Sequence, residues 1–154
     1  MAKTPRPFTK TEVAIATPLL KLMSRANTWV YRATGGRVGG KFRGGAPVML
    51  LTVVGRKTGQ RHTLPLLYLR DGAQVVTVAS KGGMDHHPLW YRNLVANPQV
   101  EVQIGKAVEP MQARTASPEE KAVLWPRLVA IYPDYAGYQL RTKRDIPVVI
   151  LAPR

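Results

Sequence analysis

The chain has 154 residues, of which 45% are hydrophobic and 21% are charged, as expected for one globular domain. It contains no cysteine, which excludes disulfides, thiolate metal sites and cysteine nucleophiles. The net charge of +14 is unevenly distributed: residues 1–61 hold 12 Lys/Arg against one acid, whereas residues 62–154 hold 11 against 8. This asymmetry predicts an anionic partner, either a nucleic acid, an anionic lipid surface or a polyanionic small molecule.

The first 16 residues are rich in Pro and Thr, and we interpret them as a flexible basic arm that precedes one domain over residues 17–154. The longest apolar run covers only residues 47–54, far fewer than the roughly 18 residues of a membrane-spanning helix. The prolines of the arm also interrupt any apolar core of a signal peptide. We therefore expect a cytoplasmic protein.

A helical pattern begins at Pro18. Its apolar stripe, spaced by three and four residues, consists of Leu19, Leu22, Met23, Ala26 and Val30, and Lys21, Arg25 and Arg32 lie off it. The pattern has two interpretations. Either the stripe packs on the core of the protein, or the segment is a basic amphipathic helix that touches the inner surface of a membrane. A basic, glycine-rich loop follows over residues 35–45.

Most of the remaining chain is predicted to form strands linked by short turns. The predicted strands cover residues 48–54, 63–70, 74–79, 100–104, 108–115 and 146–151. Asp71-Gly72 is a strong hairpin signal between the second and third strands. Pro88 starts a short helix, Ser117 caps a second one, and Pro133 begins a third short segment. This pattern predicts a mainly β, α+β fold: a small antiparallel barrel with helices that cover its ends.

Few side chains are suited to catalysis on their own. His62, His86 and His87 match no metal-ligand spacing, so we expect no metal site and place the last two in an exposed loop. Ser80 is not part of a Gly-x-Ser-x-Gly nucleophile motif. An enzyme with this sequence would therefore take its difficult chemistry from a cofactor.

Two basic, glycine-containing turns are the candidate anion sites. In Gly55-Arg56-Lys57-Thr58-Gly59, the glycines permit a tight turn, and the side chains between them offer donors to a phosphate or carboxylate. In Ser80-Lys81-Gly82-Gly83, backbone N–H groups can form an anion-binding concavity beside the lysine. Either turn is also compatible with an ordinary solvated hairpin, so the two turns alone leave both interpretations open.

Two aromatic groups are candidates for a ligand pocket. Trp90 and Asn93 share one face of the first short helix, where Trp90 either lines a flat ring pocket or anchors the core. Tyr132, Tyr135 and Tyr138 form a cluster that can line a substrate site, and a tyrosine hydroxyl there can donate a proton. Packing alone explains such tyrosines equally well.

In their order and spacing these motifs resemble the deazaflavin-dependent nitroreductase family of actinobacteria. The resemblance covers residues 18–151 and rests on Leu-Thr-x-x-Gly-Arg-Lys-Thr-Gly, Pro65-Leu66, Val-Ala-Ser-Lys-Gly-Gly, Pro-x-Trp-Tyr-x-Asn-Leu-x-Ala-Asn-Pro, Trp125-Pro126, the tyrosine cluster and Ile146-Pro147-Val148. It implies a split β-barrel and hydride transfer from reduced coenzyme F420 to a quinone-like or other conjugated acceptor. The phosphate and polyglutamate tail of F420 would account for the basic N-terminal half.

The resemblance also implies roles for individual residues. Ser80 and Tyr135 would orient or protonate the acceptor, and Tyr132 and Tyr138 would surround it. The residues implied to bind the cofactor are Arg56, Lys57, Thr58, His62, Pro65, Ala79, Ser80, Lys81, Leu89, Trp90, Tyr91, Asn93 and Tyr135.

Two positions depart from the pattern of the family. His62 stands where the family has an arginine, and Arg61, one place earlier, would point to the other face of a strand. Binding of the tail would then be weaker, or rerouted through Lys41 and Arg43. Leu67 stands where nitroimidazole-reducing members have a tyrosine, which argues against that activity here.

Two other functions stay open on the sequence. The chain could bind or carry a deazaflavin without turnover, or it could be a basic nucleic-acid-binding module. The second function is less favoured, because the basic residues surround glycine turns and do not follow a helix that could enter a groove.

Overall fold

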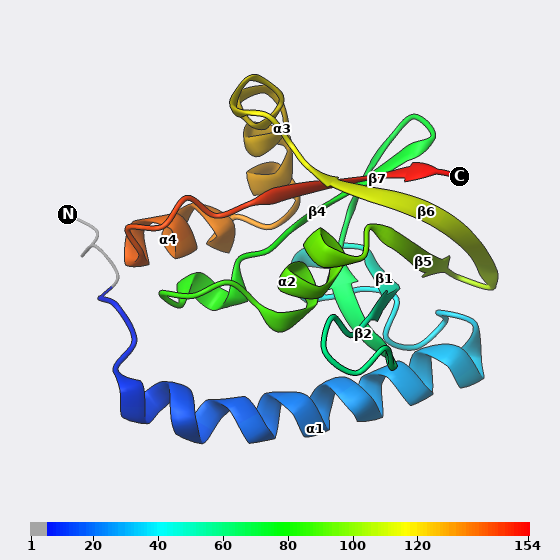
Figure 1. The fold of residues 1–154 in the computed structure, drawn as a ribbon, viewed down its shortest axis with the longest axis horizontal. Helices are drawn as coiled ribbons and strands as arrows, with labels where there is room; N and C mark the ends of the chain where they lie inside the picture. Colours follow the sequence, from blue (N-terminus) through cyan, green and yellow to red (C-terminus); the bar gives the residue numbers. More distant parts are fainter. Residues whose placement is uncertain (1–5) are drawn as a thin grey trace.

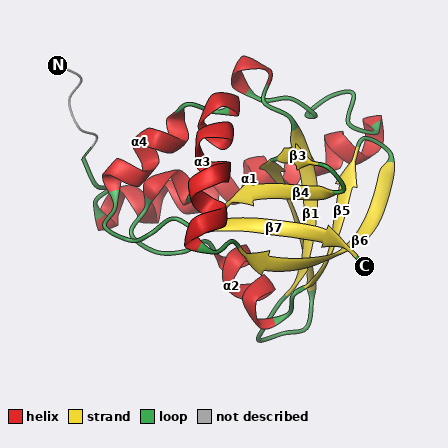
Figure 2. Ribbon diagram, turned by 90° about the horizontal axis from the view of Figure 1, so that it is seen from above, coloured by secondary structure: helices red, strands yellow, loops and turns green. Residues whose placement is uncertain are grey.

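Seven antiparallel strands form one curled sheet in the computed structural model, which describes residues 6–154 (Figures 1 and 2). The strands are β1 (Val48–Val54), β2 (Arg61–Leu67), β3 (Leu69–Asp71), β4 (Gln74–Val78), β5 (Gln99–Ile104), β6 (Ala107–Thr115) and β7 (Val148–Pro153). Their spatial order is β2-β1-β5-β6-β7-β4-β3. Each predicted strand is found within two residues of its expected bounds, except that one of them is divided.

The divided strand, predicted over residues 63–70, curls the sheet. Before Tyr68 the segment pairs with β1, and after Tyr68 it pairs with β4. One extended segment therefore supplies both outermost strands of the sheet, since β2 and β3 stand at opposite ends of the strand order. The sheet bends round into a half-barrel, which confirms the predicted barrel-like fold. A pattern of apolar residues could not predict the division, because both halves are extended.

Apolar side chains pack on both faces of the curled sheet. One cluster fills the inside of the curl and includes Met49, Leu51, Val53, Val75, Val100, Val102, Met111 and Leu151 from the strands, with Trp90 and Leu94 from α2 (Leu89–Ala96). A second cluster joins β4 and β7 to α3 (Pro118–Ile131) and α4 (Asp134–Arg141). This second cluster places the tyrosines of α4 beside β4.

The helices begin where the sequence predicts, with one exception. Pro88 precedes α2, and Ser117 caps α3 by accepting a hydrogen bond from the Glu120 N–H while the Glu120 carboxylate accepts from the Ser117 N–H. The exception is α1 (Lys10–Thr34), which starts before the predicted Pro18 because Thr9 and Glu12 form a capping box. Residues 10–16, assigned to a flexible arm, are therefore helical, and residues 1–5 lie outside the described part of the chain.

The predicted packing of the apolar stripe of α1 on the core is wrong. Leu22 and Met23 from that stripe are 66% and 59% exposed, and Trp29 on the same side is 71% exposed. The helix instead buries Thr28 and Tyr31: the Tyr31 ring packs with Val48 and Leu50, and its hydroxyl accepts a hydrogen bond from the Gly105 N–H at 2.9 Å. The side chain of Leu19 is outside the described set. Over residues 6–154, no helix combines the length and apolar character needed to cross a bilayer.

Candidate functional site

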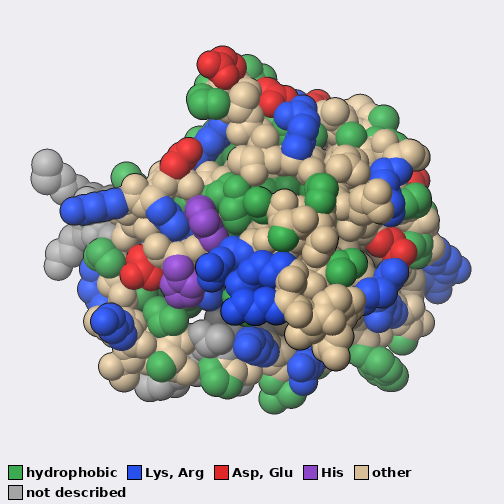
Figure 3. Space-filling view, viewed as in Figure 1, with side chains coloured by type: hydrophobic (Ala, Val, Ile, Leu, Met, Phe, Trp, Pro, Cys, Tyr) green, Lys and Arg blue, Asp and Glu red, His purple; other side chains and the backbone are tan. Residues whose placement is uncertain are grey.

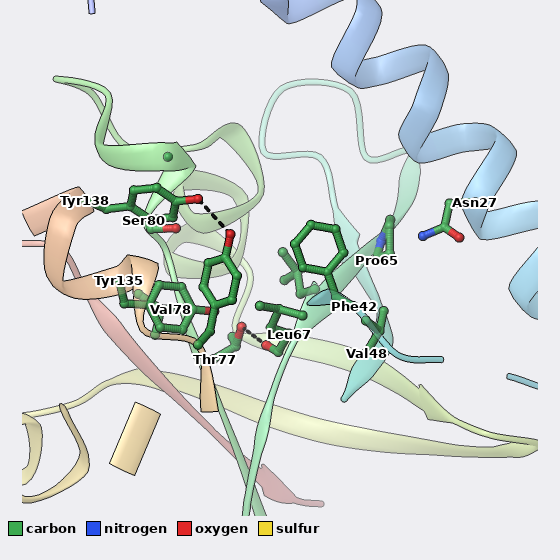
Figure 4. Close-up of a pocket in the computed structure, with 13 residues that line it drawn as sticks. Asn27, Phe42, Val48, Pro65, Leu67, Thr77, Val78, Ser80, Tyr135 and Tyr138 are labelled. Carbon is green, nitrogen blue, oxygen red and sulfur yellow. Dashed lines mark hydrogen bonds between the residues drawn. The ribbon is translucent and has the colours of Figure 1, made fainter. Parts of the chain in front are cut away.

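A cavity of about 410 Å³ lies between α1, the glycine-rich loop, β2, β4 and α4 (Figure 4). Its lining residues are Asn27, Phe42, Val48, Pro65, Leu66, Leu67, Thr77, Val78, Ser80, Gly82, Tyr132, Tyr135 and Tyr138. Aliphatic and aromatic side chains dominate, and hydroxyl groups gather at the end formed by α4 and Ser80. Such a lining suits a flat conjugated ligand that carries a few polar atoms.

The three tyrosines of the predicted cluster meet at the wall of this cavity. The ring centroids of Tyr132 and Tyr135 lie 5.1 Å apart, and the hydroxyls of Tyr132 and Tyr138 lie 3.0 Å apart. Burial raises the pKa of both Tyr132 and Tyr135 well above the usual range. Among the described residues, the Tyr135 hydroxyl makes no hydrogen bond, although this residue is only 5% exposed. It is therefore available as a donor to a bound molecule.

The Ser80–Gly83 segment forms a tight turn, with η2 (Lys81–Gly83), at the edge of the cavity. Its backbone is unusual, because Lys81 has a φ of 44° and Gly83 a φ of 80°. Gly83 also approaches α4 so closely that a Cβ atom there would lie 2.5 Å from the carbonyl oxygen of Tyr138. Gly83 thus adopts a backbone conformation that favours glycine and also allows the turn to approach α4 closely. This approach brings Ser80 beside the tyrosine cluster.

Lys81 lies within this turn, and the two adjacent histidines follow it in the chain. The Lys81 ammonium is 2.7 Å from His86 Nε2, and His86 Nδ1 is 2.9 Å from a carboxylate oxygen of Asp85. Burial lowers the pKa of Lys81, and the charges of Lys21 and Arg144 lower it further. His86 is exposed as predicted, whereas His87 is half-buried. The described residues contain no group of His, Asp and Glu side chains that could hold a metal ion.

The Gly55–Gly59 turn is anchored to α2. Asn93, a buried residue of that helix, accepts hydrogen bonds from the Arg56 N–H at 3.2 Å and from the Arg56 guanidinium at 3.1 Å. The Thr58 hydroxyl accepts from the N–H two residues later, at 3.2 Å, and stiffens the turn. Lys57 is exposed. One cation is therefore held firmly against the helix while the next projects into solvent.

The first two residues of β2 point to opposite faces. Arg61 forms an ion pair with Glu101 at 3.1 Å. His62 borders the basic turn, since a Cβ atom on Gly55 would lie 3.2 Å from His62 Nε2. Side chains alternate between the two faces of a strand. His62 therefore lies at the turn, and Arg61 points to the opposite face, where it pairs with Glu101.

The residues of α2 that were assigned to the cofactor lie outside the cavity. Trp90 packs in the inner core, as its core-anchor interpretation predicts, and Leu89 is 52% exposed. The Tyr91 hydroxyl is 2.8 Å from the Thr115 hydroxyl, and its ring packs against His87 with centroids 5.0 Å apart. Of the other assigned residues, Pro65 lines the cavity and Ala79 is buried next to it.

Sequence reasoning missed several lining residues, among them Phe42, and one residue beside the cavity, Arg144. Phe42 of the glycine-rich loop lines the cavity, and its ring centroid is 5.8 Å from that of Tyr132. A single aromatic residue within a run of glycines was the signal that could have found it. Arg144, between α4 and β7, donates hydrogen bonds to the carbonyls of Ala79 and Ser80 at 3.2 and 2.7 Å. Its sequence neighbours suggest only an ordinary charged helix end.

The cavity and the basic turn lie at opposite ends of β1. Figure 3 shows lysine, arginine and histidine side chains gathered over the face that carries α2 and the β1–β2 turn. The turn follows Val54, at the far end of β1 from the cavity-lining Val48, a separation of about 20 Å along the strand. An extended molecule with a flat ring and an anionic tail could contact both places.

Comparisons with known proteins find F420H(2)-dependent quinone reductases. A family model described as F420H(2)-dependent quinone reductase matches residues 22–153. The chain is 46% identical over 118 residues to Rv3178 of Mycobacterium tuberculosis strain H37Rv, a proposed F420H(2)-dependent quinone reductase, covering 77% of the chain and 99% of Rv3178. It is 41% identical over 133 residues to the F420H(2)-dependent quinone reductase Rv1261c of the same strain, covering 84% and 89%.

Solved structures support the fold. The structure of an F420-H2 dependent reductase, FDR-A, is 43% identical with a TM-score of 0.64, and the match covers 68% of this chain and 93% of that one. A second structure, a domain-swapped dimer, is 36% identical with a TM-score of 0.67, and the match covers 89% and 96%. More distant neighbours, such as HutZ from Vibrio cholerae at 14% identity and a TM-score of 0.53, share the fold alone. The predicted split β-barrel is confirmed.

Proposed function

Because the chain belongs to the F420H(2)-dependent quinone reductase family, we propose that it reduces a quinone-like acceptor with a hydride from reduced coenzyme F420. The observation that carries this proposal is the protonated Tyr135 side chain, which makes no hydrogen bond within residues 6–154 and lines an aromatic cavity. The basic β1–β2 turn, at the far end of β1 from the cavity-lining Val48, suits the anionic part of such a cofactor.

The residues present fit the two chemical parts of F420. Arg56 and Lys57 take part in none of the ion pairs within residues 6–154, so both cations are available to a phosphate. Thr58 and His62 would complete this end of the site. The residues proposed for the ring end are Pro65, Ala79, Ser80, Lys81 and Tyr135. Asn93 would act at the phosphate end, through its two hydrogen bonds to Arg56.

When bound, reduced F420 supplies the hydride, and the protein supplies position and a proton. Tyr135 is protonated at neutral pH, as an ordinary tyrosine is, so its hydroxyl can donate a hydrogen bond to an acceptor oxygen that gains negative charge. Tyr132 and Tyr138 hold each other through their hydroxyls and form the wall behind it. Ser80 offers a second hydroxyl at the same end of the cavity.

Equilibrium titration with F420 and with FMN tests the cofactor. We expect F420 to bind at micromolar concentration and FMN to bind more weakly, and the absence of F420 binding would contradict the proposal. Single-turnover oxidation of bound F420H2 by menadione then separates an enzyme from a carrier. A carrier protein would leave the rate of oxidation unchanged.

We also propose that α1 rests on an anionic membrane surface. The helix exposes Leu22, Met23 and Trp29 to solvent, and the exposed cations Lys21 and Arg25 lie beside them. An apolar strip flanked by cations on a helix is the pattern that binds the interface of an anionic bilayer. Asn27 of the same helix lines the cavity, so a lipophilic acceptor would meet the site close to the membrane.

Vesicle co-sedimentation tests this contact. The protein should bind vesicles that contain anionic lipid more strongly than neutral vesicles, and the double variant L22S/W29S should lose most of this binding. V123S, which replaces an exposed apolar residue of α3, is the matched control. A dimer in solution that L22S/W29S dissociates would instead assign the strip to a second copy of the chain.

A further inference from the structure

Arg144 is the centre of a hydrogen-bond network beneath the Ser80 turn. Its guanidinium donates to the Ser80 carbonyl at 2.7 Å, the Met84 carbonyl at 2.8 Å and the Ala79 carbonyl at 3.2 Å. It also lies 3.0 Å from His87 Nδ1. One side chain thus contacts residues at the start of the turn, at its end and beyond it.

The partners of Arg144 are all uncharged. It takes part in no ion pair of the described residues, and burial lowers its pKa. The His87 pKa is lowered as well, first by burial and then by the charges of Arg144 and Arg92, so His87 is neutral and can accept at Nδ1. A half-buried cation whose N–H groups bond to backbone carbonyls restrains the conformation of that backbone.

The conformation held in this way is an unfavourable one. Lys81 is the single non-glycine residue of the described chain with a positive φ, at 44°, and Gly82 and Gly83 follow at 63° and 80°. Inside the turn, the Gly83 N–H donates to the Ser80 carbonyl at 2.9 Å and the Met84 N–H donates to the Lys81 carbonyl at 3.2 Å. Backbone in such regions persists only where surrounding contacts determine it.

Arg144 is itself fixed to the helix that carries the tyrosines. The Gln139 side-chain amide of α4 donates to the Arg144 carbonyl at 2.8 Å, and its oxygen accepts from the Ile146 N–H at 3.0 Å. Gln139 is one turn beyond Tyr135 along α4. A continuous chain of hydrogen bonds therefore runs from α4 through Gln139 and Arg144 to Ser80.

We propose that Arg144 is a positioning residue that sets the place of Ser80 and Lys81 relative to Tyr135. This role rests on the proposed function, because it matters for catalysis only if the cavity binds the acceptor. The Arg144 guanidinium supplies the rigidity that the glycine-containing turn lacks, and it does so from a segment more than sixty residues away in the chain. Errors in the relative position of reacting groups of about 1 Å cost about 100-fold in rate.

Hydrogen exchange on the protein without cofactor tests the structural half of the proposal. In R144Q and R144K, the amides of Gly83 and Met84 should exchange at least about tenfold faster than in the wild type, while the amides of β5 keep their rates. R127Q removes an equally charged side chain that pairs with Asp71, and it should leave both amides unchanged. Unchanged exchange at Gly83 in both Arg144 variants would overturn the proposal, whatever the protein is found to catalyse.

Kinetics test the catalytic half. R144K should lower kcat for menadione about 100-fold and change the KM for the acceptor by less than about threefold, and any weakening of F420 binding should be much smaller than the loss of kcat. In R144A, added guanidinium should restore part of kcat, whereas an equal concentration of ammonium should not. Equal losses in kcat and in F420 binding, without guanidinium rescue, would mean that Arg144 only supports the fold. A wild type that binds no F420 would instead refute the proposed function, and the exchange result would still decide the role of Arg144 in the turn.

Discussion

The two ends of the candidate site are built in different ways. The basic turn is local: residues 55–59 form it within one hairpin, and among the described residues Asn93 is the one side chain of another element that forms hydrogen bonds with it. The cavity is assembled from α1, the glycine-rich loop, β1, β2, β4 and α4, which are far apart in the sequence. The turn therefore depends mainly on the identity of its own residues, and the cavity depends on how the helices pack on the half-barrel.

Because of this difference, we expect the turn to determine mainly the affinity for the cofactor and the cavity to determine mainly the rate of the reaction. The exposed cation of the turn can attract an anionic group without precise placement, because Coulomb forces act over several ångströms. The hydroxyls of the cavity act only at hydrogen-bond distance and must be held there. Variants of the turn should therefore weaken binding, and variants of the cavity should slow the reaction.

Tyr135→Phe should have the largest effect. The variant removes a protonated hydroxyl from the cavity, and a positioned proton donor contributes about 10²–10⁴-fold to a rate. Single-turnover oxidation of F420H2 by menadione measures this loss, and F420 affinity should change little. Tyr91→Phe is the control, since that hydroxyl bonds to Thr115 outside the cavity. A large loss of F420 affinity in Tyr135→Phe would break the distinction between the two ends.

Lys57→Ala should come next, with the reverse pattern. We expect F420 binding to weaken by about 1–3 kcal/mol, the loss of one charge-assisted hydrogen bond, while the rate at saturating F420 stays within a few-fold of the wild type. Titrations at low and high salt measure it, and the variant should show the weaker salt dependence. An unchanged affinity would show that the phosphate is held elsewhere.

Asn93→Leu tests how far the turn depends on the rest of the protein. The substitution removes the acceptor of two hydrogen bonds from Arg56, and we expect F420 binding to weaken by about 1 kcal/mol. Val95→Ser, at an exposed position of the same helix, is the control variant. If Asn93→Leu weakens binding more than Lys57→Ala, the turn depends on tertiary contacts as strongly as the cavity does.

Glu120→Gln should have the smallest effect, on the helix that precedes the tyrosines. The hydrogen bond from Arg114, followed by those from the Ser117 backbone and side chain, lowers the pKa of Glu120 to about 2 from its usual 4.5. Since the folded pKa is depressed, this carboxylate stabilises the protein above its unfolded pKa, and that contribution is lost as the pH falls toward about 2.

Thermal unfolding at several pH values measures this contribution. The Tm of Glu120→Gln should lie slightly below that of the wild type at pH 7, and the difference should shrink between pH 4.5 and pH 2. Glu119→Gln, in the same helical turn but in no ion pair of the described residues, is the control variant. A constant difference across this range would exclude the carboxylate as its source.

Much of the fold follows from local patterns. The strand at residues 48–54, the hairpin at Asp71-Gly72 and the Ser117 cap of α3 all have the predicted positions, because alternation, turn chemistry and capping act between neighbours in the chain. The same local logic located the basic turn and the tyrosine cluster. It failed at α1, where an apolar periodicity predicts a buried face without showing what covers it.

The sequence by itself determined the succession of strands and turns along the chain, the two basic glycine-containing segments and the tyrosine cluster, since each depends on residues within a few positions of one another. Only the tertiary structure decided which hydroxyls face a common cavity, which side of α1 stays exposed and which arginine holds the Ser80 turn. Those features depend on contacts between segments separated by tens of residues. Such contacts arise when the half-barrel closes and leave no periodic trace in the chain.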